Sequence, residues 1–539
     1  MRGFGTEEYD IMTTNDEIKR RRTFAIISHP DAGKTTLTEK FLLYGGQINT
    51  AGSVKGKATA KHAVSDWMEI EKERGISVTS SVLQFEYDDY CINILDTPGH
   101  QDFSEDTYRT LMAADSAVMV IDASKGVEAQ TKKLFKVVSM RGIPVFTFVN
   151  KMDRDAKDTF ELLDDIESNL GIACCPVSVP IGSGKGFRGI YDRNTKKVEI
   201  FSDTQKGTKE GTETDLDIDD PELAKYVDED EKEELLNQLE LLDGAGAEFD
   251  QEAVSAGQLS PVFFGSALLN FGVETFLHYF LKMTTPPLAR KSDAGVIEPT
   301  SPDFSGFIFK IQANMNKAHR DRIAFLRIVS GKFESGMSVF HVQGGKDVRL
   351  TQPQAMMAEE RKVVDTAYAG DIIGLFDPGI YSIGDTLTAA KDHFKFEGIP
   401  TFAPEHFARV RQVDTMKRKQ FIKGISQIAQ EGAIQIFQEY NTGMEEIIVG
   451  VVGVLQFDVL KYRLEHEYNV DIILENLPYE YIRWVENEEI DMDEISGTSD
   501  MKKVKDLKDR PLLLWANEWS IRMTEERNPG LVLSEFAQN

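Results

Sequence analysis

One run near the beginning of the chain contains the residue types that can hold a phosphate group. It follows an apolar stretch at residues 24–27 and reads Ser28, His29, Pro30, Asp31, Ala32, Gly33, Lys34, Thr35 and Thr36. A loop of this kind that opens a helix directs successive backbone N–H groups at phosphate oxygens, while the lysine adds positive charge. We therefore expect Lys34 to neutralise β- and γ-phosphates and the Thr35 hydroxyl to ligate Mg²⁺. The usual pattern begins with glycine where this chain has Ser28, but it keeps the glycine before the lysine.

A second motif has the composition of a metal and γ-phosphate contact. Asp96, Thr97, Pro98, Gly99 and His100 follow the apolar stretch at residues 91–95. We expect the Asp96 carboxylate to approach Mg²⁺ through a water molecule, and the Gly99 N–H to contact a γ-phosphate.

A third motif has the chemistry of base recognition. Asn150, Lys151, Met152 and Asp153 follow residues 145–149. The Asp153 carboxylate can accept hydrogen bonds from N1–H and the 2-amino group, which guanine has and adenine lacks. We expect Ser266 and Ala267, which follow residues 262–264, to give backbone contacts to the guanine oxygen. A wrong base leaves buried polar groups unpaired at about 1–3 kcal/mol each, so guanine is preferred.

Short apolar strands must position these motifs. The candidates are residues 24–27, 91–95, 118–121, 145–149 and 262–264, and a helix is predicted over residues 36–44. This alternation is typical of a mostly parallel sheet with helices on both faces. Ligands of such α/β sheets bind at the carboxyl ends of the strands, where all three motifs lie.

Three motifs in this order, each after a strand, resemble the P-loop GTPase superfamily. His29, Asp31 and His100 narrow the resemblance to the translation-factor GTPases. That resemblance implies GTP and GDP as ligands, with Mg²⁺, and a catalytic His100 that orients the attacking water once the ribosome has positioned it, alongside Lys34. Residues 73–77 resemble the first switch of these proteins, which normally offers threonine to Mg²⁺; Ser77 retains the hydroxyl.

Longer stretches resemble the release factor 3 family of translation factors, with one departure at Gln101, where glutamate is expected. They are residues 102–111, 309–315, 319–322 and 451–458. The resemblance implies a cytoplasmic, monomeric, ribosome-stimulated GTPase that promotes dissociation of class I release factors after peptide release.

Two alternative functions are a nucleotide-binding switch without turnover and a metabolic P-loop kinase. The guanine motif disfavours the kinase, and phosphate release with and without ribosomes separates enzyme from switch.

The chain of 539 residues is long enough for about three domains. We expect an α/β GTP-binding domain over residues 1–285, with an acidic, loop-rich insertion at about 182–260 whose charged runs are solvated. A β-barrel domain is predicted over residues 286–395, with strands at 324–329 and 372–375. An α+β domain is predicted over residues 396–539, with a helix at 417–430 and strands at 447–452 and 470–474.

Charge and cysteine content limit the partners. A formal net charge of −28 argues against indiscriminate binding to nucleic acid, and we expect no DNA partner. Ribosome contacts then need local basic clusters, or these clusters are simply solvated faces; the candidates are Arg409, Arg411, Lys417, Arg418, Lys419, Lys423 and residues 317–322. No apolar run reaches the ~18 residues of a membrane span. The neighbours Cys174 and Cys175 are expected to pack rather than to do redox chemistry.

Overall fold

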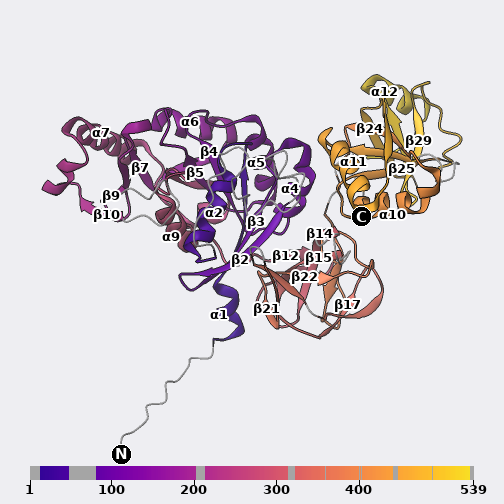
Figure 1. Ribbon diagram of the computed structural model, residues 1–539, viewed down its shortest axis with the longest axis horizontal. Helices are drawn as coiled ribbons and strands as arrows, with labels where there is room; N and C mark the ends of the chain where they lie inside the picture. The colour runs from indigo at the N-terminus through magenta and orange to yellow at the C-terminus, as the bar shows by residue number, and fades with distance from the viewer. Residues whose placement is uncertain are drawn as a thin grey trace, which may run out of the picture.

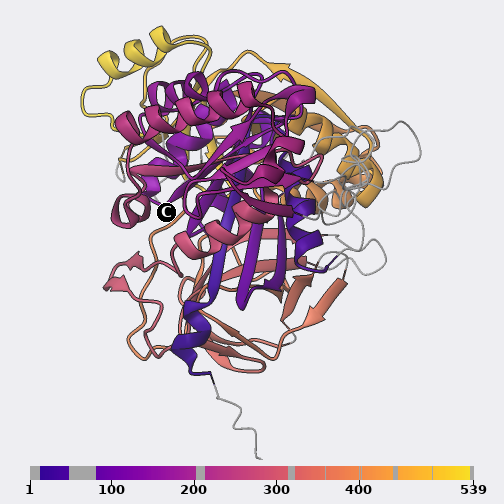
Figure 2. The same ribbon diagram turned by 90° about the vertical axis from the view of Figure 1, so that its left-hand side faces the viewer.

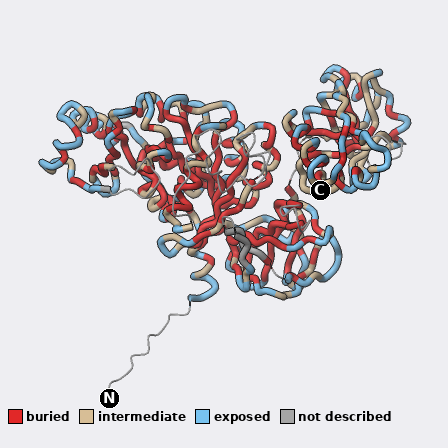
Figure 3. Tube along the Cα trace, in the orientation of Figure 1, coloured by how far each residue is buried: buried red, intermediate tan, exposed pale blue. Residues whose placement is uncertain are grey.

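The computed structural model divides the chain into three folded parts, which we call the first, second and third domains (Figure 1). The first contains the parallel sheet, the second lies below it in the figure, and the third lies beside the first. Buried residues gather inside each part, whereas exposed residues follow the outer helices and loops (Figure 3). The structure describes residues 12–47, 80–201, 213–313, 322–351, 353–357, 360–399, 401, 403–440, 447–487 and 490–534.

The first domain is built on a seven-stranded sheet in the order β2-β3-β1-β4-β5-β11-β6. Neighbouring strands are parallel, except that β2 runs antiparallel to β3. All five predicted strands lie in this sheet and overlap their predicted ranges. The bounds are β1 (Arg21–Ser28), β2 (Ser81–Tyr87), β3 (Tyr90–Asp96), β4 (Ser116–Asp122), β5 (Val145–Asn150), β6 (Ala173–Pro176) and β11 (Leu259–Phe264).

Helices cover both faces of this sheet, as predicted, and Figure 2 shows the strands between them. Alternating residues of β1 explain the arrangement, because successive side chains of a strand point to opposite faces. Phe24 packs against Phe41 of α2 and Phe280 of α9, whereas Ala25 belongs to the core on the other face, which includes residues of α4, α5 and α6. The bounds are α1 (Thr14–Lys19), α2 (Lys34–Tyr44), η1 (Gln101–Phe103), α4 (Ser104–Leu111), α5 (Ala129–Arg141), α6 (Thr159–Leu170) and α9 (Val273–Met283).

Cys174 and Cys175 confirm the same alternation at the sheet edge. Both are free, buried side chains of β6, and they belong to the cores on opposite faces of the sheet. Burial raises the pKa of both thiols, so neither is activated as a thiolate. Their role is packing.

The expectation of a loop-rich insertion at residues 182–260 is wrong for its described part. An antiparallel sheet in the order β10-β9-β8-β7 and the helix α7 form a folded subdomain. Leu235, Leu239 and Leu242 recur at helical spacing and are buried, but the acidic run at residues 228–234 that precedes them led to the expectation of a solvated loop. The bounds are β7 (Ser178–Ile181), η2 (Gly184–Gly186), β8 (Gly189–Asp192), β9 (Lys197–Phe201), β10 (Glu213–Asp217), η3 (Pro221–Lys225), α7 (Glu229–Ala245) and α8 (Gln251–Ser255).

This subdomain contains a carboxyl group that opposes folding at high pH. Burial raises the pKa of Glu199 to about 7; the Thr275 hydroxyl lowers it, while the charges of Asp192, Asp215 and Glu274 raise it. A raised folded-state pKa gives stability that is present below the unfolded pKa and is lost as the pH rises through the folded pKa. Glu199→Gln, which does not ionise, should therefore stabilise the chain by up to about 3 kcal/mol above about pH 8 and by almost nothing near pH 4.

Thermal melting across this pH range measures the effect. The exposed Glu233→Gln on α7 makes the same chemical change without burial and serves as the control. A Glu199→Gln gain that stayed constant with pH would contradict ionisation as its cause.

The second domain is antiparallel and barrel-like, as predicted. Its large sheet has the order β18-β17-β23-β14-β15-β22-β19-β20, and the pair β16-β21 closes over the same apolar core. Buried ion pairs join it to the first domain, among them Arg21–Asp371 at 2.8 Å and Arg327–Asp115 at 2.5 Å. The bounds are β12 (Arg290–Ser292), β13 (Gly295–Ile297), β14 (Ser305–Ala313), β15 (Arg322–Ser330), β16 (Lys332–Glu334), β17 (Ser338–His341), β18 (Lys346–Arg349), β19 (Gln354–Met357), β20 (Glu360–Val363), β21 (Thr366–Tyr368), β22 (Ile372–Phe376) and β23 (Thr386–Thr388).

The third domain has the predicted α+β character. Its eight-stranded antiparallel sheet has the order β27-β24-β26-β25-β29-β30-β28-β31, and α10 and α11 pack on it. The predicted helix at 417–430 begins with the short turn η4. The bounds are β24 (His406–Gln412), η4 (Thr415–Lys417), α10 (Arg418–Gln430), β25 (Gln435–Glu439), β26 (Ile447–Val451), α11 (Leu455–Tyr468), β27 (Ile472–Leu477), β28 (Tyr481–Val485), β29 (Lys502–Asp506), β30 (Pro511–Trp515), α12 (Glu518–Arg527) and β31 (Leu533–Ser534). Within the part of the chain that the structure describes, every helix is too short or too polar to cross a membrane.

Candidate nucleotide site

The loop between β1 and α2 has the backbone shape that the phosphate motif predicts. Asp31 and Gly33 adopt positive φ angles of 65° and 101°, and Ala32 N donates to His29 O at 3.2 Å. A Cβ at Gly33 would lie 2.2 Å from Asn150 Nδ2, so glycine is required there for its conformation and for space. The helix α2 begins at Lys34, two residues before its predicted start, which places Thr35 and Thr36 in its first turn.

Asn150 ties the phosphate loop to the two segments of the base motif. Its Nδ2 donates to Ala32 O at 2.8 Å, and its Oδ1 accepts from Ala267 N at 2.8 Å. Because the side chain is 2% exposed and uses its amide on the protein itself, Asn150 holds the site together. The predicted motifs therefore meet at one edge of the sheet.

The carboxylate expected to read the base lies beside the segment expected to help it. Ser266 Oγ donates to Asp153 Oδ1 at 2.6 Å, and Met152 N donates to Gly265 O at 3.1 Å. Asp153 is half-buried, whereas Met152 is buried beneath the loop. The second oxygen, Oδ2, takes no part in this bond and can accept from a hydrogen-bond donor of a ligand.

Thr35 and Asp96, the two metal-binding candidates that the structure describes, lie on neighbouring elements: Thr35 in the first turn of α2 and Asp96 at the end of β3. Lys34 Nζ contacts Asp96 Oδ1, and both side chains are buried. Thr97 Oγ1 donates to Ile26 O at 2.7 Å, which holds the loop after β3 against β1. An added Cβ at Gly99 would meet the backbone of Pro30 at 3.6 Å, so this loop passes beside the phosphate loop. The third candidate, Ser77, lies outside the described residues.

His100 lies at the start of the turn η1 and is partly accessible to water. Its side chain is 32% exposed, and its ring packs near that of Phe103. Nδ1 lies 3.3 Å from the backbone N of Asp102, from which it accepts when unprotonated, and 3.2 Å from Asp102 Oδ1, to which it donates when it carries the proton. These contacts leave Nε2 as the ring nitrogen that can face a water molecule.

Asp122 belongs to none of the predicted motifs, but it lies at the site beside the base motif and the phosphate loop. Asp122 ends β4, and its Oδ2 lies 2.6 Å from Lys151 Nζ, which also contacts Asp31 O. Burial raises the pKa of the Asp122 carboxyl, but hydrogen bonds from Lys151 and Ser124 outweigh burial and lower it below its usual value. Its position directly after the predicted strand 118–121 was the available signal. Glu128, whose Oε1 lies 3.4 Å from His29 Nε2, had no such signal.

Comparison with known proteins gives the same division of the chain. Residues 19–286 match the elongation factor Tu GTP-binding domain, residues 303–390 match elongation factor G domain 2, and residues 396–525 match the C-terminal domain of class II release factor RF3. A solved structure from Thermus thermophilus covers 90% of this chain with a TM-score of 0.68 at 22% identity, over 72% of its own length. That likeness shows the fold.

Curated relatives match over almost the entire chain. Peptide chain release factor 3 of Symbiobacterium thermophilum is 58% identical over 97% of this chain and 99% of its own length. The protein of the same name from Streptococcus thermophilus is 52% identical over 97% of this chain and its whole length. Together with the GTP-binding domain, these matches show that the protein is a GTPase and belongs to the peptide chain release factor 3 family.

Proposed function

We propose that this translation-termination GTPase binds the ribosome with GTP after peptide release, promotes dissociation of class I release factors, and leaves after hydrolysis. The observation that carries the proposal is the meeting of the phosphate loop, the base motif and His100 at one sheet edge, in a chain of this family. We further propose that it acts in the cytoplasm as a monomer, with no membrane or DNA partner.

The residues at this edge suit a guanine nucleotide with Mg²⁺. The loop around Gly33 turns its backbone toward the start of α2, where N–H groups attract anions. Among the described residues His29 Nδ1 has no hydrogen-bond partner although it is buried beside this loop, and a phosphate oxygen suits such a nitrogen. Thr35 and Asp96 offer the hard oxygen ligands that Mg²⁺ prefers, and Ser77 is proposed as a further one.

The proposed reaction is attack of water on the γ-phosphorus, which breaks the bond to the β–γ bridging oxygen and gives GDP and inorganic phosphate. Lys34 and the loop N–H groups stabilise negative charge on the phosphates, and His100 orients the attacking water. Mg²⁺, when bound, supplies further positive charge to the β- and γ-phosphates. Asp153 selects guanine by accepting hydrogen bonds from its N1–H and 2-amino groups. Positioning and charge stabilisation therefore account for the reaction, with little proton transfer by the protein.

A factor-recycling assay tests the proposed function. Ribosomes that carry a class I release factor after peptide release are mixed with this protein and GTP, and loss of the release factor is followed over time. We expect loss to be faster with GTP than without the protein. An unchanged rate of loss would reject the recycling role while leaving the GTPase activity intact.

The basic cluster of the third domain is the proposed ribosome contact that the structure supports best. Lys417 lies in η4, and Arg418, Lys419 and Lys423 follow on α10, with the last three exposed. The adjacent Met416 is 90% exposed, so none of the described elements covers this end of the helix. Dense cations on an uncovered helix end suit RNA phosphates.

The other basic candidates are less suitable. Arg409 and Arg411 pair with Glu475 across the strands at 3.7 and 2.7 Å. Arg322 is buried and pairs with Asp377 at 2.6 Å, so its proposed ribosome contact is wrong. Residues 317–321 lie outside the described residues.

Charge reversal of Lys417, Arg418 and Lys419 to glutamate should weaken ribosome binding. Each lost phosphate contact should also reduce the slope of log K against log salt by about one. Binding is measured over a series of salt concentrations. Reversal of Lys132, Lys133 and Lys136, which are exposed on α5, makes the same change in net charge as a control. Unchanged affinity and slope would remove this cluster from the proposal.

A further inference from the structure

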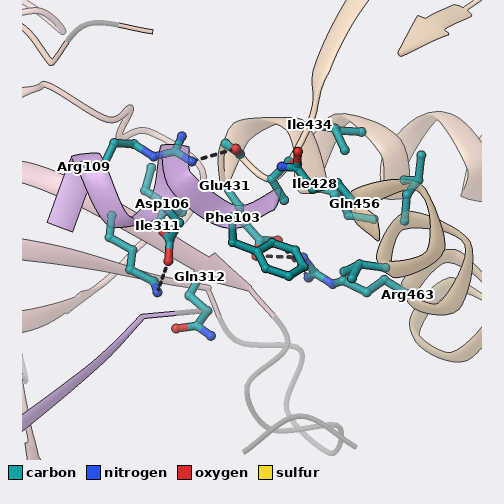
Figure 4. A pocket seen from close by; sticks show the side chains of 15 residues that line it. Phe103, Asp106, Arg109, Ile311, Gln312, Ile428, Glu431, Ile434, Gln456 and Arg463 are labelled. Carbon is teal, nitrogen blue, oxygen red and sulfur yellow. Dashed lines mark hydrogen bonds and ion pairs between the residues drawn. The ribbon is translucent and has the colours of Figure 1, made fainter. Parts of the chain in front are cut away.

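The segment that follows His100 contacts all three domains. In Figure 4, α4 of the first domain faces β14 of the second and the helix ends of the third. Asp106 lies 3.5 Å from Lys310 Nζ of β14, and Arg109 Nη2 donates to Gly432 O of the third domain at 2.8 Å. Asp106 Oδ2 also accepts from Ser80 N at 2.7 Å. The elements beside the candidate catalytic histidine are therefore in direct contact with both neighbouring domains.

Asp102 makes the most direct of these connections. It is 6% exposed, and its two carboxylate oxygens face different domains. Oδ1 lies 3.2 Å from His100 Nδ1, whereas Oδ2 accepts from Leu455 N, the first residue of α11, at 2.8 Å. Leu455 N is one of the first N–H groups of a helix, which have no partner within the helix itself. One buried side chain thus links the histidine to the third domain.

The loop that presents Leu455 is itself held by hydrogen bonds. Val452 N and Gly453 N donate to Gln456 Oε1 at 2.9 and 3.0 Å, and Gln456 Nε2 donates to Ala433 O at 2.8 Å. A Cβ at Gly453 would lie 2.3 Å from Asp102 Cβ, so the close approach of the two domains requires glycine. Hydrogen bonds within the third domain and the close approach at Gly453 therefore hold the contact between Asp102 and Leu455 in place.

We propose that Asp102 is a positioning residue through which the docked third domain sets the orientation of His100. This inference rests on the water-orienting role of His100 proposed above. In the tautomer with the proton on Nδ1, the Asp102 carboxylate accepts from Nδ1–H through Oδ1, and Nε2 is left as the acceptor for a hydrogen bond from the attacking water. Because Leu455 N holds the other carboxylate oxygen, undocking of the third domain frees Asp102 and the ring to rotate. The rate of a reaction falls about a hundredfold when the group that orients the reacting water is misplaced by about 1 Å.

Three variants test this coupling in ribosome-stimulated GTP turnover. Asp102→Ala and Gly453→Ala should lower kcat about ten- to a hundredfold and leave KM for GTP within about twofold, because neither residue belongs to the motifs proposed to bind the nucleotide. Gly453→Ala acts from the third domain by pushing its loop away from Asp102. The fall in kcat should be smaller in Asp102→Asn, since asparagine keeps an oxygen that accepts from Leu455 N. In a His100→Ala background, Asp102→Ala should have no further effect.

Matched controls separate coupling from loss of structure. Val454→Ala alters the exposed neighbour of Leu455, and Gly244→Ala alters a helical glycine with open space around it; both should turn over like the parent chain. Thermal melting checks that each variant is folded; if Asp102→Ala is not, Asp102→Asn and Gly453→Ala decide the question.

Two results would overturn the inference alone. The first is an unchanged kcat in Gly453→Ala. The second is an Asp102 variant that lowers kcat by the same factor in the parent chain and in the His100→Ala background. Unchanged turnover in His100→Ala itself would instead reject the proposed role of the histidine, and the coupling with it.

Discussion

Asp153→Asn should shift the nucleotide preference of this GTPase from GTP to xanthosine triphosphate. Guanine offers two donors to a carboxylate, and an asparagine amide faces one of them with a donor of its own. Xanthine has a carbonyl in place of the 2-amino group, so it accepts from that amide. Unpaired groups cost about 1–3 kcal/mol each, so kcat/KM for GTP should fall about a hundredfold or more.

The structure indicates that this variant keeps its local fold. Ser266 Oγ donates to Asp153 Oδ1, and the amide oxygen of asparagine can accept the same bond. Ribosome-stimulated kcat/KM is measured for both nucleotides. Asp155→Asn, at an exposed neighbouring position, makes the same change away from the base motif. Continued preference for GTP in Asp153→Asn would exclude Asp153 as the base-reading group.

His100→Ala should separate binding from turnover. The ring contacts Asp102 and lies near Phe103, and none of its observed contacts is with the base motif. Affinity for GTP should therefore stay close to that of the parent chain. Ribosome-stimulated hydrolysis should fall about a hundredfold or more, because the water loses the group that orients it.

Two measurements are needed for this variant. Equilibrium binding of a fluorescent guanine nucleotide gives affinity, and single-turnover phosphate release with ribosomes gives the rate of hydrolysis. His278→Ala removes a more exposed histidine of α9 and serves as the control. Stimulated hydrolysis at the parent rate would show that another group orients the water.

Much of the nucleotide site could be predicted before any tertiary information. The motifs at Gly33, Asp96 and Asp153 each follow an apolar strand, and parallel strands end at the same edge of a sheet. The strands themselves were recognisable because each is a short buried apolar run with a polar loop after it. Local pattern is sufficient in such cases, because the sheet geometry brings the loop residues together.

Other features depend on contacts that local pattern does not contain. The subdomain around α7 was missed because the acidic residues of its surface outweighed a short run of leucines that forms its buried face. Glu128 lies beside His29, although no motif connects them.

The sequence by itself therefore determined the domain classes and the GTPase activity, and it predicted the loops that we propose to bind the nucleotide. Tertiary structure alone decided that Arg322 is buried in an ion pair and that Asp102 joins His100 to Leu455. The physical reason is distance along the chain. Asp102 and Leu455 are separated by 353 positions, and only the packing of whole domains brings such a donor and acceptor within 2.8 Å.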